Sequence, residues 1–232
     1  MRIGGLQKLT LIDYPGKIAA IIFTQGCNWR CGYCHNPELV LSAKYEDLIP
    51  EDAVLEFLMK RKGQLEGVVI SGGEPTIQAD ISSFLAKIKA LDYSVKLDTN
   101  GSNPAVLKNI LELNLVDYVA MDIKACPSHY SQAVGKKMDM KPITESIACI
   151  LDSGLPYQFR TTLVKPVCPL GDLKELFSLI AEANHYVLQE FIPSQKIIDQ
   201  SLLDQPHYTR PEIDALRLKF EKIPPDLALY YL

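Results

Sequence analysis

Short apolar runs alternate with segments of helical periodicity along most of the chain. The runs carry few polar interruptions, as is expected of parallel strands covered on both faces. We predict six strands from them, over residues 18–23, 68–70, 95–99, 116–123, 157–164 and 186–191. Apolar residues at helical spacing predict helices over 51–62, 81–88, 104–111, 142–152, 173–180 and 211–222. Strand and helix therefore alternate from residue 18 onward.

This alternation predicts an α/β fold built from βαβ units around a parallel sheet. An eight-unit barrel typically takes about 250 residues, whereas this chain has 232 residues and six predicted units. We therefore expect an open, partial (β/α)6 TIM-like barrel in a single domain, 1–232. Residues 1–17 are expected to form a β appendage, 18–191 the partial barrel, and 192–232 a C-terminal extension with one helix.

Two local patterns make further predictions. Residues 128–140 are polar and irregular, which predicts a long loop between the fourth strand and the following helix. Asp172 and Glu175 have the spacing of a capping box, in which the two side chains close the amino end of a helix. We therefore expect a helix to begin after Asp172.

Charge and composition exclude some classes of partner. The formal net charge is −4 and no basic run stands out, so we expect no nucleic acid partner. No apolar stretch approaches the length that spans a bilayer, and the first 20 residues lack the pattern of a signal peptide. We expect no membrane partner and a cytoplasmic location, where cysteines stay reduced and are available as ligands.

Polar residues and glycines gather where the predicted strands end. Cysteines follow the first strand, and Gly72-Gly73-Glu74 follows the second. Asp98-Thr99-Asn100 closes the third strand, Asp122 with Lys124 closes the fourth, and Arg160 lies inside the fifth. In parallel α/β barrels the chemistry lies at the carboxyl ends of the strands. These groups are therefore expected to form one site.

Three of the six cysteines, Cys27, Cys31 and Cys34, lie within eight residues. Structural zinc usually takes four protein ligands, and His35 would have to bend back sharply to supply the fourth. A cubane iron–sulfur cluster held by three thiolates fits better, because one iron then stays open for a non-protein ligand.

The motif Cys27-x-x-x-Cys31-x-Tyr33-Cys34 resembles the signature of the radical S-adenosylmethionine (radical SAM) enzymes. The resemblance implies a partial barrel of the radical SAM type that holds a [4Fe-4S] cluster on Cys27, Cys31 and Cys34. The open iron would bind SAM, and one electron would cleave SAM to a 5′-deoxyadenosyl radical. Gly72-Gly73-Glu74-Pro75 matches the motif that these enzymes direct toward the methionine amino group.

Asp98-Thr99-Asn100-Gly101 and Asp122-Ile123-Lys124 more narrowly resemble the glycyl radical enzyme activases, such as pyruvate formate-lyase activase. The resemblance implies that Asp98, Thr99 and Asp122 form a monovalent cation site beside the SAM carboxylate. Lys124 and Arg160 would lie near the same end of the cofactor. The histidine that pyruvate formate-lyase activase carries near the end of its sixth strand has no counterpart here, where residues 188–195 read LQEFIPSQ.

The stretch 11–17 (LIDYPGK) and His35-Asn36-Pro37 are most similar to the activating proteins of anaerobic ribonucleoside-triphosphate reductase. This implies that the enzyme abstracts a hydrogen from a backbone glycine of a partner protein. Reduced flavodoxin or ferredoxin would donate the electron. No ferredoxin-like insertion follows the first strand, so we expect one cluster.

Alternatives stay open at this point. A radical SAM enzyme acting on a small molecule, like the carboxy-deazaguanine synthases, is one, and an iron–sulfur electron carrier without enzymatic activity is another. Cys126 and Cys168 both precede prolines beyond strands four and five, and a second metal or redox site on this pair is a further alternative. Cys149 is expected in a helix.

Overall fold

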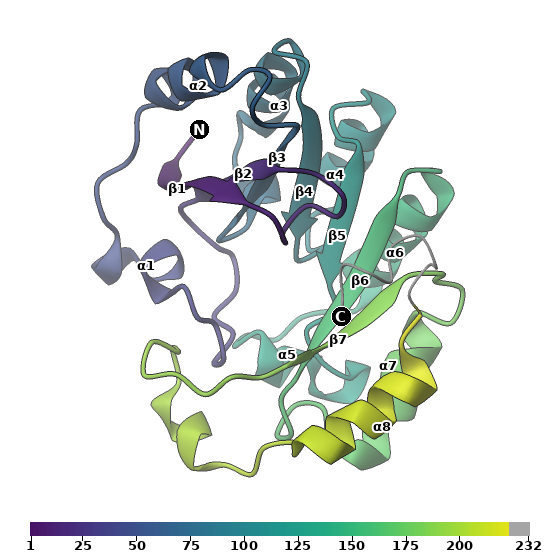
Figure 1. Cartoon of the computed structure of the whole chain (residues 1–232). Coiled ribbons are helices and arrows are strands. Elements are labelled where there is room, and N and C mark those ends of the chain that lie inside the picture. Colours follow the sequence, from purple (N-terminus) through teal and green to yellow (C-terminus); the bar gives the residue numbers. More distant parts are fainter. Residues whose placement is uncertain (223–232) are drawn as a thin grey trace.

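The computed structural model describes residues 1–222. Its centre is a seven-stranded sheet in the order β1-β2-β3-β4-β5-β6-β7, with β1 and β7 at the two ends. The sheet curves into an open barrel (Figure 1). The six predicted strands are confirmed as the parallel strands β2 (Ala19–Thr24), β3 (Gly67–Gly72), β4 (Ser94–Thr99), β5 (Tyr118–Asp122), β6 (Tyr157–Leu163) and β7 (Tyr186–Glu190).

From β2 onward, helices connect successive strands and cover the outer face of the sheet (Figure 1). Their apolar faces hold the side chains that the periodicity placed inward, for example Phe84 and Ile110, both fully buried. The long helices are α2 (Glu51–Lys60), α3 (Ile81–Lys89), α4 (Pro104–Glu112), α6 (Lys141–Asp152), α7 (Leu173–Leu179) and α8 (Arg210–Phe220). Residues 223–232 of the predicted C-terminal extension lie outside the described part of the chain.

The first segment is an edge strand of the main sheet. β1 (Ile3–Thr10) pairs antiparallel with β2, with Leu6 opposite Ile22. The chain then turns, and Tyr14 packs back against the sheet with 3% of its surface exposed. The β structure expected over 1–17 is present, and it extends the barrel sheet at its open side.

Apolar side chains close the amino end of the barrel interior. Ile21 pairs with Val69, and Phe23 with Ser71, so these residues lie on one face of the sheet. Ile21 and Val69 form a buried cluster with Tyr14 and Tyr118. Lys96 of β4 pairs with Val69 and with Tyr118, so it is the charged residue at the level of this otherwise apolar floor.

The loop predicted over 128–140 is partly wrong. It contains a short 3-10 turn (Pro127–His129) and the helix α5 (Tyr130–Ala133). Tyr130 is buried and meets the ring of Trp29 edge-on at 5.9 Å between centroids. The sequence did not predict this helix because most of its residues are polar and only a few face inward. Those few pack on the cysteine loop, which is far away in the sequence.

The capping box predicted at Asp172 is also wrong. α7 begins after Asp172, but the Asp172 side chain makes no cap hydrogen bond. Glu175 instead accepts from the backbone N–H of Ser128 at 3.2 Å. A capping box is present on α8, where Thr209 and Glu212 bond reciprocally. Glu175, which the sequence pattern assigned to the cap of α7, is therefore bound to Ser128 of a different segment.

Candidate active site

A cavity of about 300 Å³ lies at the carboxyl ends of the parallel strands. Its volume is at the lower end of the range for small-molecule sites. Every residue predicted for the site lines it: Cys27, Cys31, Tyr33, Cys34, Gly72, Gly73, Glu74, Asp98, Thr99, Asn100, Asp122, Lys124 and Arg160. The sequence analysis did not assign seven further lining residues, which are Trp29, His35, Asn36, Val40, Ser71, Thr162 and Gln189.

The cysteine loop leaves β2 and passes over the mouth of the barrel. Its backbone is held from outside, because the N–H of Arg30 donates to the carbonyl of Val134 at 2.9 Å. Cys31 is buried, and Cys27 and Cys34 are partly exposed. Burial raises the pKa of all three thiols, that of Cys31 to about 12. These thiols therefore require a strongly electrophilic partner to become thiolates.

Three thiols on one loop at the cavity wall fit a cubane cluster. Each thiolate of such a cluster binds a different iron, so the three sulfurs need not converge on one point. Within residues 1–222, no group of three or more His, Cys, Asp or Glu side chains could hold a single metal ion. The zinc alternative receives no support from this arrangement.

Gly72 and Gly73 bring the backbone of β3 tightly against the start of the cysteine loop. The N–H of Gly73 donates to the carbonyl of Thr24 at 2.9 Å, and that of Glu74 donates to Gly26 at 2.8 Å. Gly72 has φ +111°, and a Cβ on Gly73 would lie 2.0 Å from the Gly26 oxygen. Only glycine fits this contact, which fixes the loop relative to the sheet.

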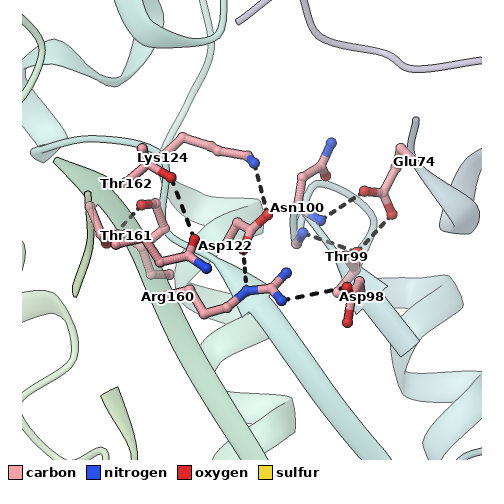
Figure 2. Close-up of polar contacts among 12 residues, drawn as sticks. Glu74, Asp98, Thr99, Asn100, Asp122, Lys124, Arg160, Thr161 and Thr162 are labelled. Carbon is pink, nitrogen blue, oxygen red and sulfur yellow. Dashed lines mark hydrogen bonds and ion pairs between the residues drawn. The ribbon is translucent and has the colours of Figure 1, made fainter. Parts of the chain in front are cut away.

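The Glu74 carboxylate ties the turn after β3 to the end of β4, where Thr99 and Asn100 donate to it (Figure 2). Oε1 accepts from the Thr76 N–H at 3.1 Å, the Thr76 hydroxyl at 2.6 Å and the Thr99 hydroxyl at 2.7 Å. Oε2 accepts from the N–H of Asn100 at 2.7 Å. Burial raises the pKa of Glu74, and these four donors oppose the rise. The side chain therefore acts inside the protein as a structural anchor.

Asn100 links the end of β4 to the cysteine loop. Its Nδ2 donates to Oδ1 of Asn28 at 3.0 Å, and Nδ2 of Asn28 donates to the Ser102 hydroxyl at 2.7 Å. Asn28 lies directly after the first cysteine, yet sequence reasoning gave it no role. The amide side chain of Asn28 could have indicated this role, because polar groups in a packed loop need hydrogen-bond partners.

Arg160 lies between two aspartates from neighbouring strands (Figure 2). Its Nε donates to Oδ1 of Asp122 at 2.7 Å, and its Nη1 reaches Oδ2 of Asp98 at 3.5 Å. Lys124 Nζ donates to the other Asp122 oxygen at 2.9 Å. Although burial favours the neutral acid, Arg160 and Lys124 hold the pKa of Asp122 well below its usual range. The network therefore keeps its carboxylates ionised.

Two tyrosines hold the backbone of Lys124. The Tyr33 hydroxyl donates to the Lys124 carbonyl at 2.7 Å, and the Lys124 N–H donates to the Tyr130 hydroxyl at 3.2 Å. Tyr33 comes from the cysteine motif, so the cluster loop and the ionic network share an anchor. Tyr33, the aromatic residue before the last cysteine of the motif, thus helps to position both the cysteine loop and Lys124.

The residues predicted for a monovalent cation do not fit one. Asp98 accepts from Lys96, Ser71 and Arg160, and Asp122 from Arg160 and Lys124. The Thr99 hydroxyl donates to Glu74 and accepts from the Gly101 N–H. A cation here would have to displace cationic side chains that already bind both carboxylates. The monovalent cation site therefore stays a prediction, and in this structure the carboxylate oxygens implied for it are bonded to cationic side chains of the protein.

Lys96 is the main member of the site that sequence reasoning missed. Its side chain is 1% exposed, and its Nζ lies 2.5 Å from Oδ1 of Asp98. Lys96 reads as an ordinary strand residue because its neighbours are apolar. The available signal was its spacing, since residues two apart on a strand lie on the same face.

Gln189 lines the cavity near the end of β7. It pairs with Thr162 of β6 in register, and both side chains line the wall. His35, on the opposite loop, contacts the carbonyl of Ile192 through Nε2 at 2.8 Å. These polar groups surround the cavity on the side of β6 and β7.

Cys126 and Cys168 do not join this cavity. Both are fully buried, and a hydrogen bond to Cys168 together with burial raises the pKa of the Cys126 thiol. Neither is among the residues that line the wall. A second metal or redox site on this pair stays a prediction without support from the cavity. Cys149 lies in α6, as expected.

Comparisons with known proteins place the chain in a family. The model of the radical SAM superfamily matches residues 21–180. A protein of Methanocaldococcus jannaschii with the name "Putative glycyl-radical enzyme activating enzyme" is 34% identical over 200 residues, covering 82% of this chain and 80% of that protein. The pyruvate formate-lyase-activating enzyme of Clostridium pasteurianum is 34% identical over 128 residues, covering 53% of this chain and 52% of that enzyme.

Solved structures share the fold at low identity. SuiB of Streptococcus suis superposes with a TM-score of 0.66 at 15% identity, covering 86% of this chain and 44% of SuiB. Coproporphyrinogen III oxidase of Escherichia coli superposes with a TM-score of 0.60 at 14% identity, covering 89% of this chain and 52% of the oxidase. Within residues 1–222, no helix is long and apolar enough to cross a membrane. The chain belongs to the radical SAM superfamily and, within it, to the glycyl-radical enzyme activating enzymes, which use a [4Fe-4S] cluster and SAM.

Proposed function

We propose that this enzyme activates a glycyl radical enzyme by abstracting a hydrogen from a backbone glycine, and that the partner is an anaerobic ribonucleoside-triphosphate reductase. The observation that carries the proposal is the single cavity that unites the cysteine loop, the glycine pair and the ionic network. The relative that covers most of the chain bears the name of such an activating enzyme. The similarity of residues 11–17 and 35–37 to reductase activating proteins supports this choice of partner.

When bound, the cluster and SAM supply the 5′-deoxyadenosyl radical, and the chain holds both in place. Cys27, Cys31 and Cys34 would hold the cluster. The backbone at Gly72 and Gly73 would accept from the amino group of SAM. Three cationic side chains, Lys96, Lys124 and Arg160, meet only two carboxylates in the network, so one positive charge is in excess. That excess favours binding of the SAM carboxylate.

A protein substrate suits the open side of the barrel. Gln189 is exposed and lines the cavity. Together with Thr162 and His35, it offers polar groups to a peptide backbone that enters between the cysteine loop and the end of β7. A glycine has no side chain, so its Cα can approach the cofactor without steric hindrance.

Electron paramagnetic resonance tests the proposal. The reconstituted enzyme is incubated anaerobically with reductant, SAM and the anaerobic reductase polypeptide of the same organism. A glycyl radical signal in the reductase is the expected result, and reduced flavodoxin or ferredoxin should replace the chemical reductant. Deoxyadenosine formation without any radical in the reductase would contradict this choice of partner.

Alanine variants of Cys27, Cys31 and Cys34 connect this signal to the cluster. Each should abolish both the radical and SAM cleavage, because three ligands are the minimum for a site-differentiated cluster. Cys149→Ala is the matched control, since Cys149 lies in α6 and does not line the cavity. Cleavage that survives the loss of Cys31 with a clean cluster would overturn the ligand assignment.

A further inference from the structure

A lysine ammonium group lies inside the barrel, directly beneath the carboxylates that were expected to bind a metal cation. Lys96 is 1% exposed, and its Nζ is 2.5 Å from Oδ1 of Asp98. Tyr118, the residue of β5 that pairs with Lys96, has its ring centroid 5.9 Å from Nζ. The apolar floor of the barrel therefore separates this charge from solvent on the amino side of the sheet.

Asp98 has each of its oxygens committed to a different cationic partner. Oδ1 accepts from Lys96 at 2.5 Å, and Oδ2 accepts from Arg160 at 3.5 Å and from the Ser71 hydroxyl at 3.1 Å. A buried carboxylate without a counter-charge is strongly unfavourable, whereas one that is paired and hydrogen-bonded is tolerated. Lys96 and Arg160 together therefore meet the requirement for positive charge at Asp98.

We infer that Lys96 is a positioning residue that takes the place of a bound monovalent cation. Its tethered ammonium is the nearer cation at Asp98, so Arg160, which reaches Asp98 only at 3.5 Å, and Lys124 hold Asp122 and present the excess positive charge to the SAM carboxylate. The enzyme should then bind SAM without potassium or sodium. This inference rests on the SAM binding that the superfamily shares and not on the identity of the protein partner.

Removing the Lys96 charge should create the cation requirement that the wild-type enzyme lacks. In Lys96→Met the side chain keeps most of its length but loses its charge, so the network holds two cations against two carboxylates and has no excess for SAM. Space and negative charge then become available beside Asp98 for a small cation. Choline is too large to enter, so choline chloride serves as the salt that maintains ionic strength.

SAM binding to the reconstituted enzyme is measured by calorimetry in potassium chloride, sodium chloride and choline chloride at equal ionic strength. Wild-type enzyme should give dissociation constants that agree within about twofold across the three salts. Lys96→Met should bind SAM at least about tenfold more weakly in choline, and potassium or sodium should restore most of the loss. A wild-type enzyme that requires potassium or sodium would overturn the inference.

Lys89→Met is the matched control. Lys89 pairs with Asp117 at 2.7 Å but does not line the cavity. Its SAM affinity should stay at the wild-type value in every salt, whatever the variant does to stability. Equal affinity of Lys96→Met in all three salts would also overturn the inference, because Lys96 would then have only a packing role.

Thermal unfolding of the protein without cluster or SAM gives a second readout. A cation that binds only the folded state raises the midpoint of unfolding. Potassium at about ten times its dissociation constant should raise the midpoint of Lys96→Met by roughly 3 °C relative to choline, and should leave wild-type and Lys89→Met unchanged. Should Lys96→Met fail to fold in choline, the salt comparison on wild-type enzyme still decides the question. Failure to activate a reductase would leave these binding results intact.

Discussion

At the scale of single residues, the site separates groups that face the cavity from groups that hold those groups in place. Glu74 belongs to the second kind, because its two oxygens accept four hydrogen bonds from Thr76, Thr99 and Asn100. Glu74 follows the two glycines in the motif Gly72-Gly73-Glu74-Pro75, yet its carboxylate accepts hydrogen bonds from protein groups. Its effect on the cofactor is exerted through the backbone that it fixes.

Glu74→Gln should destabilise the protein, because an amide group would face backbone and hydroxyl donors in a buried position. The expected loss in the free energy of unfolding is about 2–4 kcal/mol, measured by urea denaturation of the protein without cofactors. Glu56→Gln, on the exposed face of α2, should change it by less than about 0.5 kcal/mol. Equal stability of the two variants would contradict the anchoring role.

Gly73→Ala should disrupt the contact between β3 and the cysteine loop, since the new Cβ would lie 2.0 Å from the Gly26 oxygen. We expect SAM affinity to fall by at least about tenfold, with cluster content measured in parallel. Gly171→Ala is the matched control, because a Cβ there meets nothing within 4 Å and the backbone is not left-handed. Wild-type SAM binding by Gly73→Ala would show that the loop can shift without consequence.

At the scale of elements, helix ends depend on tertiary contacts that short patterns do not contain. Glu175 bonds to Ser128 instead of capping α7, whereas Glu212 completes the box with Thr209 on α8. Both sequences satisfy the same spacing rule. The difference arises because the loop after β5 folds back against the start of α7.

Thr209→Ala should therefore cost about 1 kcal/mol of unfolding free energy, the usual effect of losing an N-cap. Asp172→Ala should cost less than about 0.5 kcal/mol, because Asp172 makes no cap bond and only a long, partly exposed contact of 3.6 Å to His129. Denaturant unfolding of the two variants checks the order. A larger loss for Asp172→Ala would contradict the observed caps.

Elements with strong periodicity were predictable, and short elements were not. The six parallel strands and the long helices follow from apolar spacing, because each buries one continuous face. α5 escaped prediction because it spans only Tyr130–Ala133 and packs on Trp29. The pairing of β1 with β2 also depends on the fold, since the periodicity of residues 3–10 does not reveal a neighbour.

At the scale of the whole molecule, one topological rule located most of the site. The carboxyl ends of parallel strands meet at one end of a barrel, so the motifs at the ends of β2, β3, β4 and β5 had to converge, and every residue predicted for the site lines one cavity. Lys96 was missed because its strand is apolar and its partner Asp98 is on the same strand. The charge balance from which we infer that Lys96 replaces a bound cation depends on distances, which no spacing rule supplies.

Isotope transfer tests the central claim most directly. The anaerobic reductase polypeptide is produced with glycine deuterated at Cα and incubated with reduced enzyme and SAM, and the 5′-deoxyadenosine is analysed by mass spectrometry. Abstraction from a backbone glycine predicts one deuterium in the deoxyadenosine, together with a glycyl radical in the reductase. Deoxyadenosine without deuterium, formed while the reductase stays radical-free, would contradict the account.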